Sequence, residues 1–474
     1  MHRNLNDINR RTFLGRLGVG TAALAAGRCG VARAAARKPN VLFIFTDDQR
    51  EDTVGAFGNG HIQTPNLDAL AESGVVFSNA YCMGGFSPAV CLPSRMMTLR
   101  GRSWFSVREL PKGFANLPSS MSAAGYQTFH IGKMGNTDRE VHALFDESGY
   151  VQPIEHEGDL PKNCDQLVRR EGRPGEHVAN AAIDFLGRRD KSRPFFMYLS
   201  GAEPHDPRVA PQAYLDRYDL DKIPLPPNFM PFHPFDNGEL LIRDEKLAAW
   251  PRSEEEIRGH LRDYYAVITH MDEQFGRIFQ ALKDAGEYDN TVIVFSSDQG
   301  LAVGSHGLMG KQNLYEHSMG APLIFAGPGI PRGKRLEAFA YLFDIFPTLC
   351  ELVGAPVPGD LEGKSLAPVI HGEQDSVRDT VFLGYRDFQR AVRRGPWKLI
   401  RYPKVNKTQL FNLEKDPFET NDLAADPQHA DKVQELLALM KQQQKVYGDT
   451  APLVVENPRP AEVGLEFFKF GTKK

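Results

Sequence analysis

The segment PNVLFIFTDDQ, residues 39–49, places a continuous apolar run directly before two aspartates and a glutamine. A run that is apolar on both faces is typical of a buried parallel strand covered by helices. Residues 194–199 and 291–296 have the same character, and helical patterns at 176–188 and 254–285 lie near them in the chain. We therefore expect an α/β sandwich with a large, mostly parallel central sheet flanked by helices.

The composition changes after residue 373, which predicts a second, smaller folding unit. Short strand-like segments and one helical segment follow, at 380–383, 391–393, 397–400 and 430–444. We interpret this part as a C-terminal α+β subdomain with an antiparallel sheet. The expected organisation is a main domain over 37–373 and this subdomain over 374–474. A segment rich in proline and phenylalanine, 221–250, is expected to be a long loop that contributes substrate contacts.

Residues 1–36 have the features of a targeting segment. Arg10-Arg11-Thr12-Phe13-Leu14 is a twin-arginine signature, and the apolar run LGVGTAALAA and the small-residue site at 34–36 follow it. The apolar run is too short and too rich in glycine to form a stable membrane span. We therefore expect export by the twin-arginine route to the periplasm or the extracellular space.

The overall composition excludes some classes of function. The chain has 474 residues, 41% of them hydrophobic, and a formal net charge of -4 from 56 basic and 60 acidic residues. These values are ordinary for a soluble globular protein, and no arginine-rich tract or nucleic-acid motif is present. We expect no nucleic-acid partner.

A second acidic cluster follows the predicted strand at 291–296, in the sequence Ser297-Asp298-Gln299-Gly300. Ligands of open α/β sheets bind at the carboxyl ends of the strands, so this cluster and Asp47-Asp48 are expected to face one crevice. Carboxylate and amide oxygens suit Ca²⁺ or Mg²⁺ rather than zinc. A single acidic strand end is more often a solvated turn or a helix cap, but two matched ends favour a metal site.

The stretch SPAVCLPSRMMTLRGR contains Cys91-Leu92-Pro93-Ser94-Arg95, which matches the pattern C-x-P-x-R. With PNVLFIFTDDQ, TPNLDALAESGVVFSNAY, GYQTFHIGK, PHDP, SSDQG and QLFNLEKDPFETNDL, it resembles the type I, formylglycine-dependent sulfatases of the alkaline phosphatase superfamily. The arylsulfatases, choline-sulfatases and iduronate-sulfatases belong to this group. The resemblance implies that a maturation enzyme oxidises Cys91 to formylglycine (3-oxoalanine), whose hydrate attacks the sulfur of a sulfate ester.

The resemblance also implies a role for each of several residues. Asp47, Asp48, Asp298 and Gln299 would hold one divalent ion, normally Ca²⁺ and less commonly Mg²⁺, and Cys91 as formylglycine would add a ligand. Gln299 stands where asparagine or histidine is more usual in the family. Among the catalytic residues, Arg95 would hydrogen-bond the hydrate.

Four further residues are expected to meet the substrate. Lys133 and Lys311 correspond to the two lysines that bind sulfate, and His205 to the histidine that binds sulfate and protonates the leaving alcohol. His306 is a further candidate for substrate contact. Taken singly, each has an ordinary alternative as a solvated lysine or an incidental histidine.

One position departs from the family pattern. Sulfatases usually carry a histidine two or three residues after the first lysine, whereas this chain has Lys133-Met134-Gly135-Asn136. Asn136 can hydrogen-bond the hydrate but is no base at neutral pH. His130 or His142 could take the place of this histidine. Alternatively, turnover could use a different base or be slow.

The sequence thus favours an exported sulfatase that hydrolyses a sulfate ester, with a carbohydrate ester as the expected substrate. Two alternatives stay open: a phosphonate or phosphate ester hydrolase on the same scaffold, and a non-catalytic protein that binds sulfated glycans. The natural substrate is not readable, and choline sulfate, a sulfated monosaccharide and a sulfated polysaccharide all remain candidates.

Overall fold

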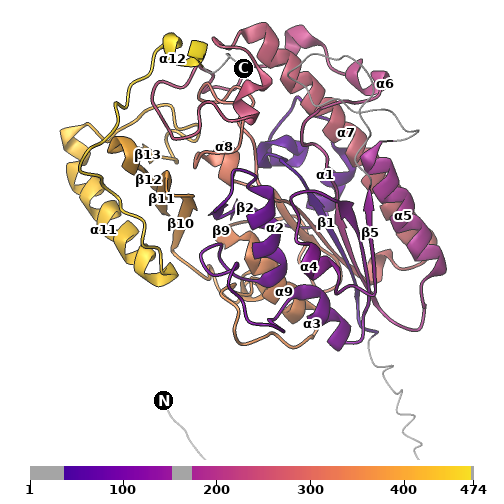
Figure 1. The fold of residues 1–474 in the computed structure, drawn as a ribbon. Helices are drawn as coiled ribbons and strands as arrows, with labels where there is room; N and C mark the ends of the chain where they lie inside the picture. Colours follow the sequence, from indigo (N-terminus) through magenta and orange to yellow (C-terminus); the bar gives the residue numbers. More distant parts are fainter. Residues whose placement is uncertain (1–36, 152–172, 471–474) are drawn as a thin grey trace, which may run out of the picture. The chain divides into compact units, whose positions relative to one another are not determined.

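The first predicted strand, β1 (Asn40–Thr46), lies inside a large sheet of the computed structural model, which describes residues 37–151 and 173–470. The predicted targeting segment, 1–36, lies outside the described residues. The sheet has eight strands in the order β5-β4-β6-β1-β7-β8-β2-β9 (Figure 1). β8 is antiparallel to both of its neighbours, and the other pairings are parallel, so the predicted sheet type is confirmed. The remaining strands of this sheet are β2 (Gly74–Tyr81), β4 (Gln127–Lys133), β5 (Glu147–Val151), β6 (Phe195–Ser200), β7 (Thr291–Ser297), β8 (Leu323–Ala326) and β9 (Lys334–Tyr341).

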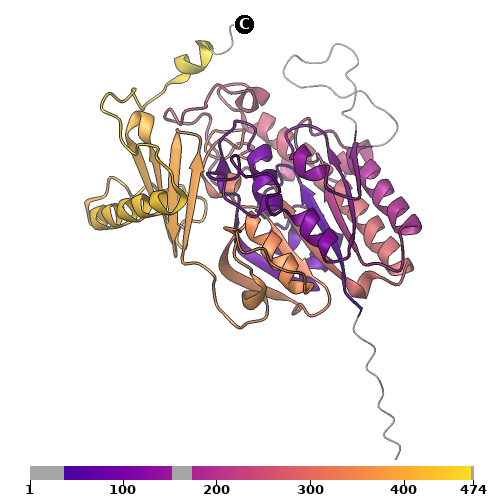
Figure 2. The ribbon, with the colours of Figure 1, turned by 60° about the horizontal axis from the view of Figure 1, so that its bottom comes forward.

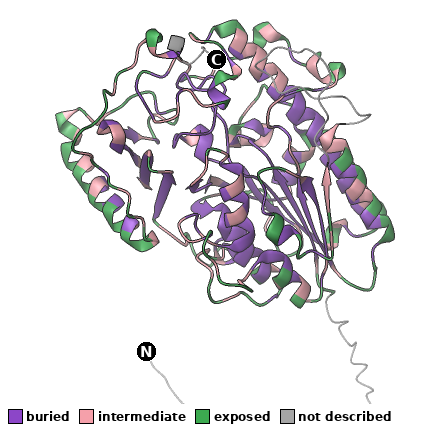
Figure 3. Cartoon of the chain, viewed as in Figure 1, coloured by how far each residue is buried: buried purple, intermediate pink, exposed green. Residues whose placement is uncertain are grey.

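Helices cover both faces of this sheet, as the apolar run of β1 predicts. Val41, Phe43 and Phe45 pack into one hydrophobic core, and Leu42 and Ile44 pack into another. Because successive side chains of a strand point to opposite faces, a strand between two helical layers must be apolar at every position. The first core contains side chains of α2 (Cys91–Arg100), α3 (Leu117–Ala123) and α9 (Ile345–Leu352); the second contains those of α1 (Pro65–Glu72), α5 (Pro174–Arg188) and α7 (Glu254–Asp284). The inner strands are buried in Figure 3, whereas the edge strand β5 is only partly buried and the outer faces of the helices are exposed.

The contact between α1 and α7 depends on one buried carboxylate. Asp272 of α7 accepts hydrogen bonds from the backbone N–H groups of Asn66 and Leu67 and from the Asn66 side chain, at 2.8–3.0 Å. These amides are at the start of α1, where backbone N–H groups have no partner within the helix. Asp272 therefore anchors the first turn of α1.

A second sheet follows the large one in the chain, in the order β13-β12-β11-β10-β3. Its C-terminal strands pair antiparallel and α11 packs against β11 and β12 (Figure 2), which confirms the predicted α+β character of this part. β3 comes from the N-terminal part of the chain and pairs parallel with β10. The bounds are β3 (Gly84–Gly85), β10 (Thr380–Tyr385), β11 (Gln389–Arg394), β12 (Trp397–Tyr402), β13 (Lys407–Asn412) and α11 (Ala430–Tyr447).

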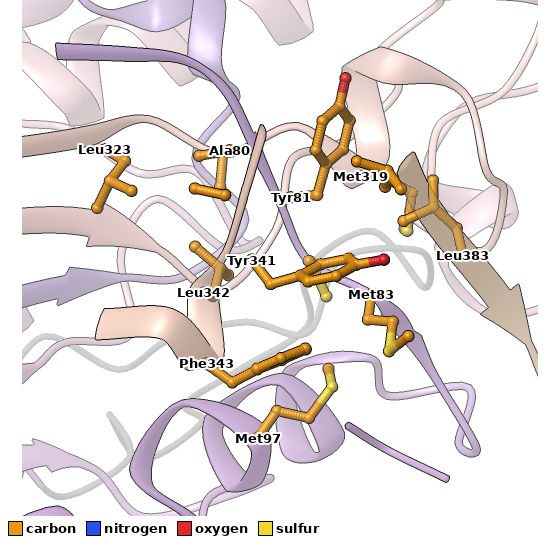
Figure 4. Close-up of a cluster of buried hydrophobic side chains, with 14 of the residues drawn as sticks. Ala80, Tyr81, Met83, Met97, Met319, Leu323, Tyr341, Leu342, Phe343 and Leu383 are labelled. Carbon is orange, nitrogen blue, oxygen red and sulfur yellow. The ribbon is translucent and has the colours of Figure 1, made fainter. Parts of the chain in front are cut away.

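The two sheets share one hydrophobic core. Figure 4 shows Tyr81 of β2, Met97 of α2, Tyr341 of β9 and Leu383 of β10 gathered around Met83. All five belong to the same cluster of buried side chains. From Lys38 onward the chain clusters as one unit, and the domain boundary at residues 373/374 stays a prediction.

Short helices occupy the connections. The predicted loop over 221–250 contains two short 3₁₀ helices, η3 (Leu220–Lys222) and η4 (Asp244–Leu247). Over 37–151 and 173–470, no helix combines the length and the apolar character that crossing a membrane requires. The other short helices are η1 (Glu51–Thr53), η2 (Gly55–Phe57), α4 (Arg139–His142), α6 (Gln212–Leu215), η5 (Tyr288–Asn290), α8 (Glu316–Met319), η6 (Leu342–Asp344), α10 (Ala367–Ile370), η7 (Pro403–Val405), η8 (Pro427–His429) and α12 (Leu465–Phe470).

The β3–β10 pairing generates a prediction about stability. Gly84 has a φ of +96°, and a Cβ there would lie 2.1 Å from the carbonyl oxygen of Gly384. Gly84→Ala therefore combines backbone strain with overpacking and should lower the free energy of unfolding by about 3 kcal/mol. Urea unfolding followed by circular dichroism measures the change.

Gly187→Ala is the matched control. Gly187 is an exposed residue of α5, and a Cβ there would meet nothing within 4 Å. It should stabilise the helix by about 0.5–1 kcal/mol. Equal stability of the Gly84→Ala variant and the wild type would show that the β3–β10 pairing tolerates a side chain.

Candidate active site

The two acidic clusters meet at the carboxyl ends of β1 and β7. The strands pair parallel with Thr46 opposite Ser297, so the residues that follow are neighbours. The backbone N–H of Asp48 donates to Asp298 Oδ1 at 3.0 Å, and that of Asp298 donates to the Thr46 carbonyl at 3.2 Å. Asp48 adopts a φ of +63°, a left-handed conformation that aspartate tolerates better than most residues. The structure therefore brings together the carboxylates that the sequence placed at one crevice.

Cys91 is the first residue of α2 and is buried beside these carboxylates. Its Sγ lies 3.2 Å from Asp47 Oδ1 and 4.0 Å from Asp48 Oδ1. One ligand atom from each of Asp47, Asp48, Cys91 and Asp298 lies within 4.8 Å of the others. We call these four residues the acidic cluster.

Arg95 lies one helical turn after Cys91 and is completely buried. Its Nε donates to Asp298 Oδ2 at 3.0 Å and its Nη2 to Asp47 Oδ2 at 3.1 Å. Its other donors reach the backbone carbonyls of Thr46, Ser200 and Gly201. In this structure Arg95 thus orients two carboxylates, and the hydrogen bond to a hydrate on residue 91 stays a prediction.

Two lysines complete the charge balance of the acidic cluster. Lys133, the last residue of β4, forms an ion pair with Asp47. Lys311 Nζ lies 2.8 Å from both carboxylate oxygens of Asp48 and 3.2 Å from Cys91 Sγ. With Arg95, three cations face three carboxylates, as buried charges require.

The pKa shifts follow from this balance. Burial would raise the pKa of Asp47, but Lys133 and Arg95 outweigh it and hold this pKa well below its usual range. Burial, with repulsion from Asp47, raises the pKa of Asp298 to about 6. Burial also raises the pKa of the Cys91 thiol, so the unmodified side chain stays protonated. An unmodified thiol is therefore a poor nucleophile here, because the thiolate is the reactive form.

His205 lies at the edge of the acidic cluster, between Pro204 and Asp206 in the predicted PHDP motif. Its Nδ1 is 2.7 Å from the backbone carbonyl of Asp206, which only accepts hydrogen bonds, so Nδ1 carries the proton. Its Nε2 faces Asp48 Oδ2 at 3.6 Å. Asp206 is a further residue of this site: its carboxylate lies 3.4 Å from Nδ1 and pairs with Arg243, and its place in the PHDP motif is the only sequence signal for it.

A cleft of about 290 Å³ opens beside His205 and Lys133. Its lining also includes Asn136, an exposed residue of the segment where the family usually carries a histidine. The remaining lining combines six uncharged residues with four charged ones, namely Met134, Gly135, Val151, Pro174, Ala202 and Pro207, with Asp47, Arg173, Glu203 and Asp206. The cleft therefore opens onto Asp47 of the acidic cluster.

His130 and His142, the two possible substitutes for the usual histidine, are held in place by their neighbours. His130 is buried between the hydroxyls of Ser148 and Ser200, each 2.9 Å from one of its ring nitrogens. The rings of His130 and His142 pack with centroids 3.8 Å apart, and burial lowers the pKa of both, that of His142 to about 3. Neither histidine is among the residues that line the cleft beside His205 and Lys133.

His306 lies in a buried aromatic group. Its ring stacks on Tyr315 with centroids 3.9 Å apart and is 5.6 Å from the ring of His317. Burial, with the neighbouring His233, lowers the pKa of His306 to about 3. Its contact with substrate stays a prediction.

Gln299 shows that the residues fit a divalent ion. Its Nε2 donates to Asp48 Oδ1 at 2.6 Å and to Cys91 Sγ at 3.3 Å, whereas its buried Oε1 has no hydrogen-bond partner among the described residues. The two ends of an amide are assigned from the hydrogen-bond network, and rotation about its terminal bond exchanges them. The exchanged amide would add an oxygen to three carboxylates, a donor set that suits a hard cation.

Comparison with protein-family models identifies the family. The model described as Sulfatase matches residues 39–355, more than half of the chain. The chain belongs to the sulfatase family. A second model, described as N-sulphoglucosamine sulphohydrolase, C-terminal, matches residues 304–446 of this sulfatase. The predicted family and its place in the alkaline phosphatase superfamily are confirmed, and the protein is a sulfuric ester hydrolase by family.

Several relatives are similar in sequence to this sulfatase over most of its chain. The sulfatase is 27% identical to an N-acetylglucosamine-6-O-sulfatase of Bacteroides thetaiotaomicron, over 88% of each protein. It is 29% identical to an arylsulfatase of Clostridium perfringens, covering 85% of this chain and 94% of the relative. A choline-sulfatase of Rhizobium meliloti is 28% identical and covers 82% of this chain and 83% of its own length.

Solved structures confirm the fold. A protein in complex with its substrate D-glucosamine-2-N,6-O-disulfate superposes with a TM-score of 0.72 at 24% identity, over 88% of this chain and 99% of that one. A phosphonate monoester hydrolase of Agrobacterium radiobacter superposes with a TM-score of 0.71 at 23% identity, over 86% and 96%. At these identities the likeness establishes the fold and leaves the substrate open.

The acidic cluster generates a prediction about metal binding. Ca²⁺ should raise the thermal unfolding midpoint of the chelator-treated protein, because only the folded chain assembles the carboxylates. At a free Ca²⁺ concentration one hundred times the dissociation constant, the free energy of unfolding should rise by about 2.7 kcal/mol. Asp298→Asn should remove most of this gain in a thermal melt with and without Ca²⁺.

Asp272→Asn is the matched control, since Asp272 is also buried and hydrogen-bonded but lies outside the acidic cluster. It should lower the midpoint and keep the response to Ca²⁺. An Asp298→Asn variant that responds to Ca²⁺ as the wild type does would contradict the proposed ligand set.

Proposed function

We propose that this protein is an exported sulfatase that hydrolyses a carbohydrate sulfate ester through formylglycine made from Cys91, with one bound Ca²⁺. The observation that carries the proposal is the position of Cys91: its Sγ lies 3.2 Å from Lys311 Nζ and 3.2 Å from Asp47, among carboxylates beside an open cleft. Cys91 also begins the C-x-P-x-R pattern, whose Arg95 binds the same carboxylates.

Two groups supply the chemistry that ordinary side chains lack. Formylglycine supplies a hydrated aldehyde, whose hydroxyl is a nucleophile toward the sulfur of the ester. Ca²⁺ supplies positive charge that reduces the repulsion between this hydroxyl and the anionic ester. Asp47, Asp48, Asp298 and Gln299 would hold the ion, and Arg95 keeps Asp47 and Asp298 oriented toward it.

The two lysines would bind and orient the sulfate group. In this structure Lys133 and Lys311 neutralise Asp47 and Asp48. A dication would take over that role, so both ammonium groups would be available to the anionic oxygens of the ester. Because both are nearly buried, their attraction to an anion is stronger than at an open surface.

His205 would act on the leaving alcohol. Its Nδ1–H donates to the Asp206 carbonyl, which fixes the ring orientation and leaves Nε2 directed toward Asp48. A protonated Nε2 can donate to the ester oxygen as the S–O bond breaks, which is general acid catalysis.

The names of the relatives support a carbohydrate as the substrate. Besides the N-acetylglucosamine-6-O-sulfatase, a Delta 4,5-hexuronate-2-O-sulfatase of Bacteroides thetaiotaomicron and an ulvan-active sulfatase of Formosa agariphila are each 28% identical over 87% of this chain. The cleft beside His205 has room for a small leaving group such as one sugar ring. The choline-sulfatase relative leaves a small alkyl sulfate as a competing substrate.

Hydrolysis of a phosphonate ester is the second candidate function. It is supported by the likeness in fold to phosphonate monoester hydrolases and by the shared geometry of the two anions, since both are tetrahedral and need the same cations. The third candidate is a non-catalytic protein that binds sulfated glycans. It is supported by the asparagine at position 136, in the segment where the family usually carries a histidine.

The proposal predicts the effect of replacing Cys91. Protein from a host that matures sulfatases should carry the aldehyde at residue 91, detected as a sulfur-for-oxygen exchange in the mass of that peptide. It should release sulfate from sulfated sugars and aryl sulfates. Cys91→Ala should lower the rate by at least about a thousandfold, because the nucleophile is gone.

Cys350→Ala is the control, because Cys350 is buried in α9, away from the acidic cluster. It should keep both the aldehyde and the rate. Faster cleavage of an aryl phosphonate than of an aryl sulfate would make the second candidate the main activity. Equal sulfate release by the wild type and Cys91→Ala would instead favour the binding protein.

Export by the twin-arginine route is a further part of the proposal. Arg10 and Arg11 lie in the signature that supports it. Conservative replacement of both residues by lysine should retain the precursor inside a bacterial host that has this pathway, whereas the wild type is processed and exported. Cell fractionation with detection of the C-terminal part measures this, and export of the double variant would contradict the proposed route.

A further inference from the structure

Residues 244 and 245 of the segment expected to contact substrate instead face the inside of the protein. Asp244 and Glu245 begin η4, and both are buried. They pack against the backbone around Lys311, which is distant from them in the sequence. Two buried carboxylates thus lie beside a lysine that pairs with the acidic cluster.

Glu245 binds two consecutive backbone amides with one carboxylate. Its Oε2 accepts from the N–H of Met309 at 2.9 Å, and its Oε1 accepts from the N–H of Gly310 at 2.9 Å. Arg252 donates to the same carboxylate at 2.9 Å. Hydrogen bonds to an ionised acceptor are roughly twice as strong as neutral ones. The two residues that precede Lys311 are thus held by a charged group.

A second set of contacts begins at Gln312, on the other side of Lys311. Its Oε1 accepts from the backbone N–H of Lys311 at 3.1 Å, and its Nε2 donates to Asp244 Oδ2 at 2.7 Å. The same Nε2 lies 2.9 Å from the carbonyl of Pro88, three residues before Cys91. Residues 309–311, which we call the Lys311 turn, are therefore also connected to the segment that leads into Cys91.

Gly310 packs so closely against the side chains that hold it that a side chain here would collide with them. A Cβ at this residue would lie 2.3 Å from Gln312 Oε1 and 3.1 Å from Glu245 Oε1. The backbone N–H groups of residues 309, 310 and 311 each end on a side-chain oxygen within 3.1 Å. Because Lys311 has a long and flexible side chain, its ammonium group can be positioned only if its backbone is fixed.

We propose that Glu245 is a positioning residue of the sulfatase, which holds the Met309–Gly310 turn so that Lys311 Nζ reaches Asp48 and residue 91. Its importance for turnover rests on the proposed function. Its effect on the position of Lys311 does not, because this follows from the contacts of the turn alone.

The variant Glu245→Gln tests the proposal. A glutamine has the size of the glutamate, but only one of its two end groups accepts hydrogen bonds, so one backbone amide loses its partner. The side chain also loses its charge beside Arg252. A displacement of the turn should lower kcat/KM for an aryl sulfate by about 10- to 100-fold, the range expected when a binding group moves by about 1 Å.

A double-mutant cycle separates positioning from general damage. If Glu245 acts through Lys311, Glu245→Gln should lower kcat/KM by less than about threefold in a Lys311→Met background. The same loss in both backgrounds would overturn the proposal. Asp272→Asn is the matched control, because Asp272 also binds two backbone amides, those of α1. It should lower the unfolding midpoint. At temperatures where the variant is still folded, its kcat/KM should equal that of the wild type.

A measurement without turnover tests the same point. Lys311 Nζ is buried and bound by Asp48, so acetylation by acetic anhydride should be slow in the wild type and in Asp272→Asn. In Glu245→Gln, mass spectrometry should find faster labelling of Lys311. Unchanged labelling would overturn the proposal, whether or not the wild type hydrolyses sulfate esters.

If Glu245→Gln does not fold, Glu245→Asp carries the same tests. The shorter side chain keeps the charge but cannot reach both amides, so it should give a smaller loss of kcat/KM and intermediate labelling. A wild type that releases no sulfate refutes the proposed function, and the labelling of Lys311 still decides the role of Glu245.

Discussion

The active site of this sulfatase depends on the mutual neutralisation of buried charges. Asp47, Asp48 and Asp298 come within a few ångströms of one another at the ends of two paired strands, where they would repel strongly without cations. Arg95, Lys133 and Lys311 supply an equal positive charge and form ion pairs with these carboxylates. Isolated buried charges are very costly, so each group is kept in place by its partners.

This balance explains how one site could bind both ligands of the proposed function. The carboxylates suit a hard dication, and the lysines suit an anionic ester. When neither ligand is bound, each set neutralises the other, which stabilises the folded chain. Arg95 differs from the lysines because its planar guanidinium bridges two carboxylates and three carbonyls at once, so it orients the site.

The fold delivers these groups from remote parts of the chain. β1 and β7 supply the carboxylates, α2 supplies Cys91 and Arg95, and β4 supplies Lys133. Lys311 comes from a turn instead of a strand or helix, and a turn has less intrinsic rigidity. Its position therefore depends on added contacts, of which Glu245 forms the strongest set.

The sequence by itself determined the sheet and most of the acidic cluster, since both rest on local patterns. β1 is apolar at every position because helices cover both faces, and aspartates after two such strands must meet at one edge. The partners of these groups were decided only by the tertiary structure: that Arg95 binds carboxylates, that His306 stacks on Tyr315, and that Glu245 holds the turn of Lys311. The reason is physical. A local pattern shows which face of a strand or helix a residue occupies. These contacts join segments that are far apart in the chain, and a long-range contact leaves no local pattern.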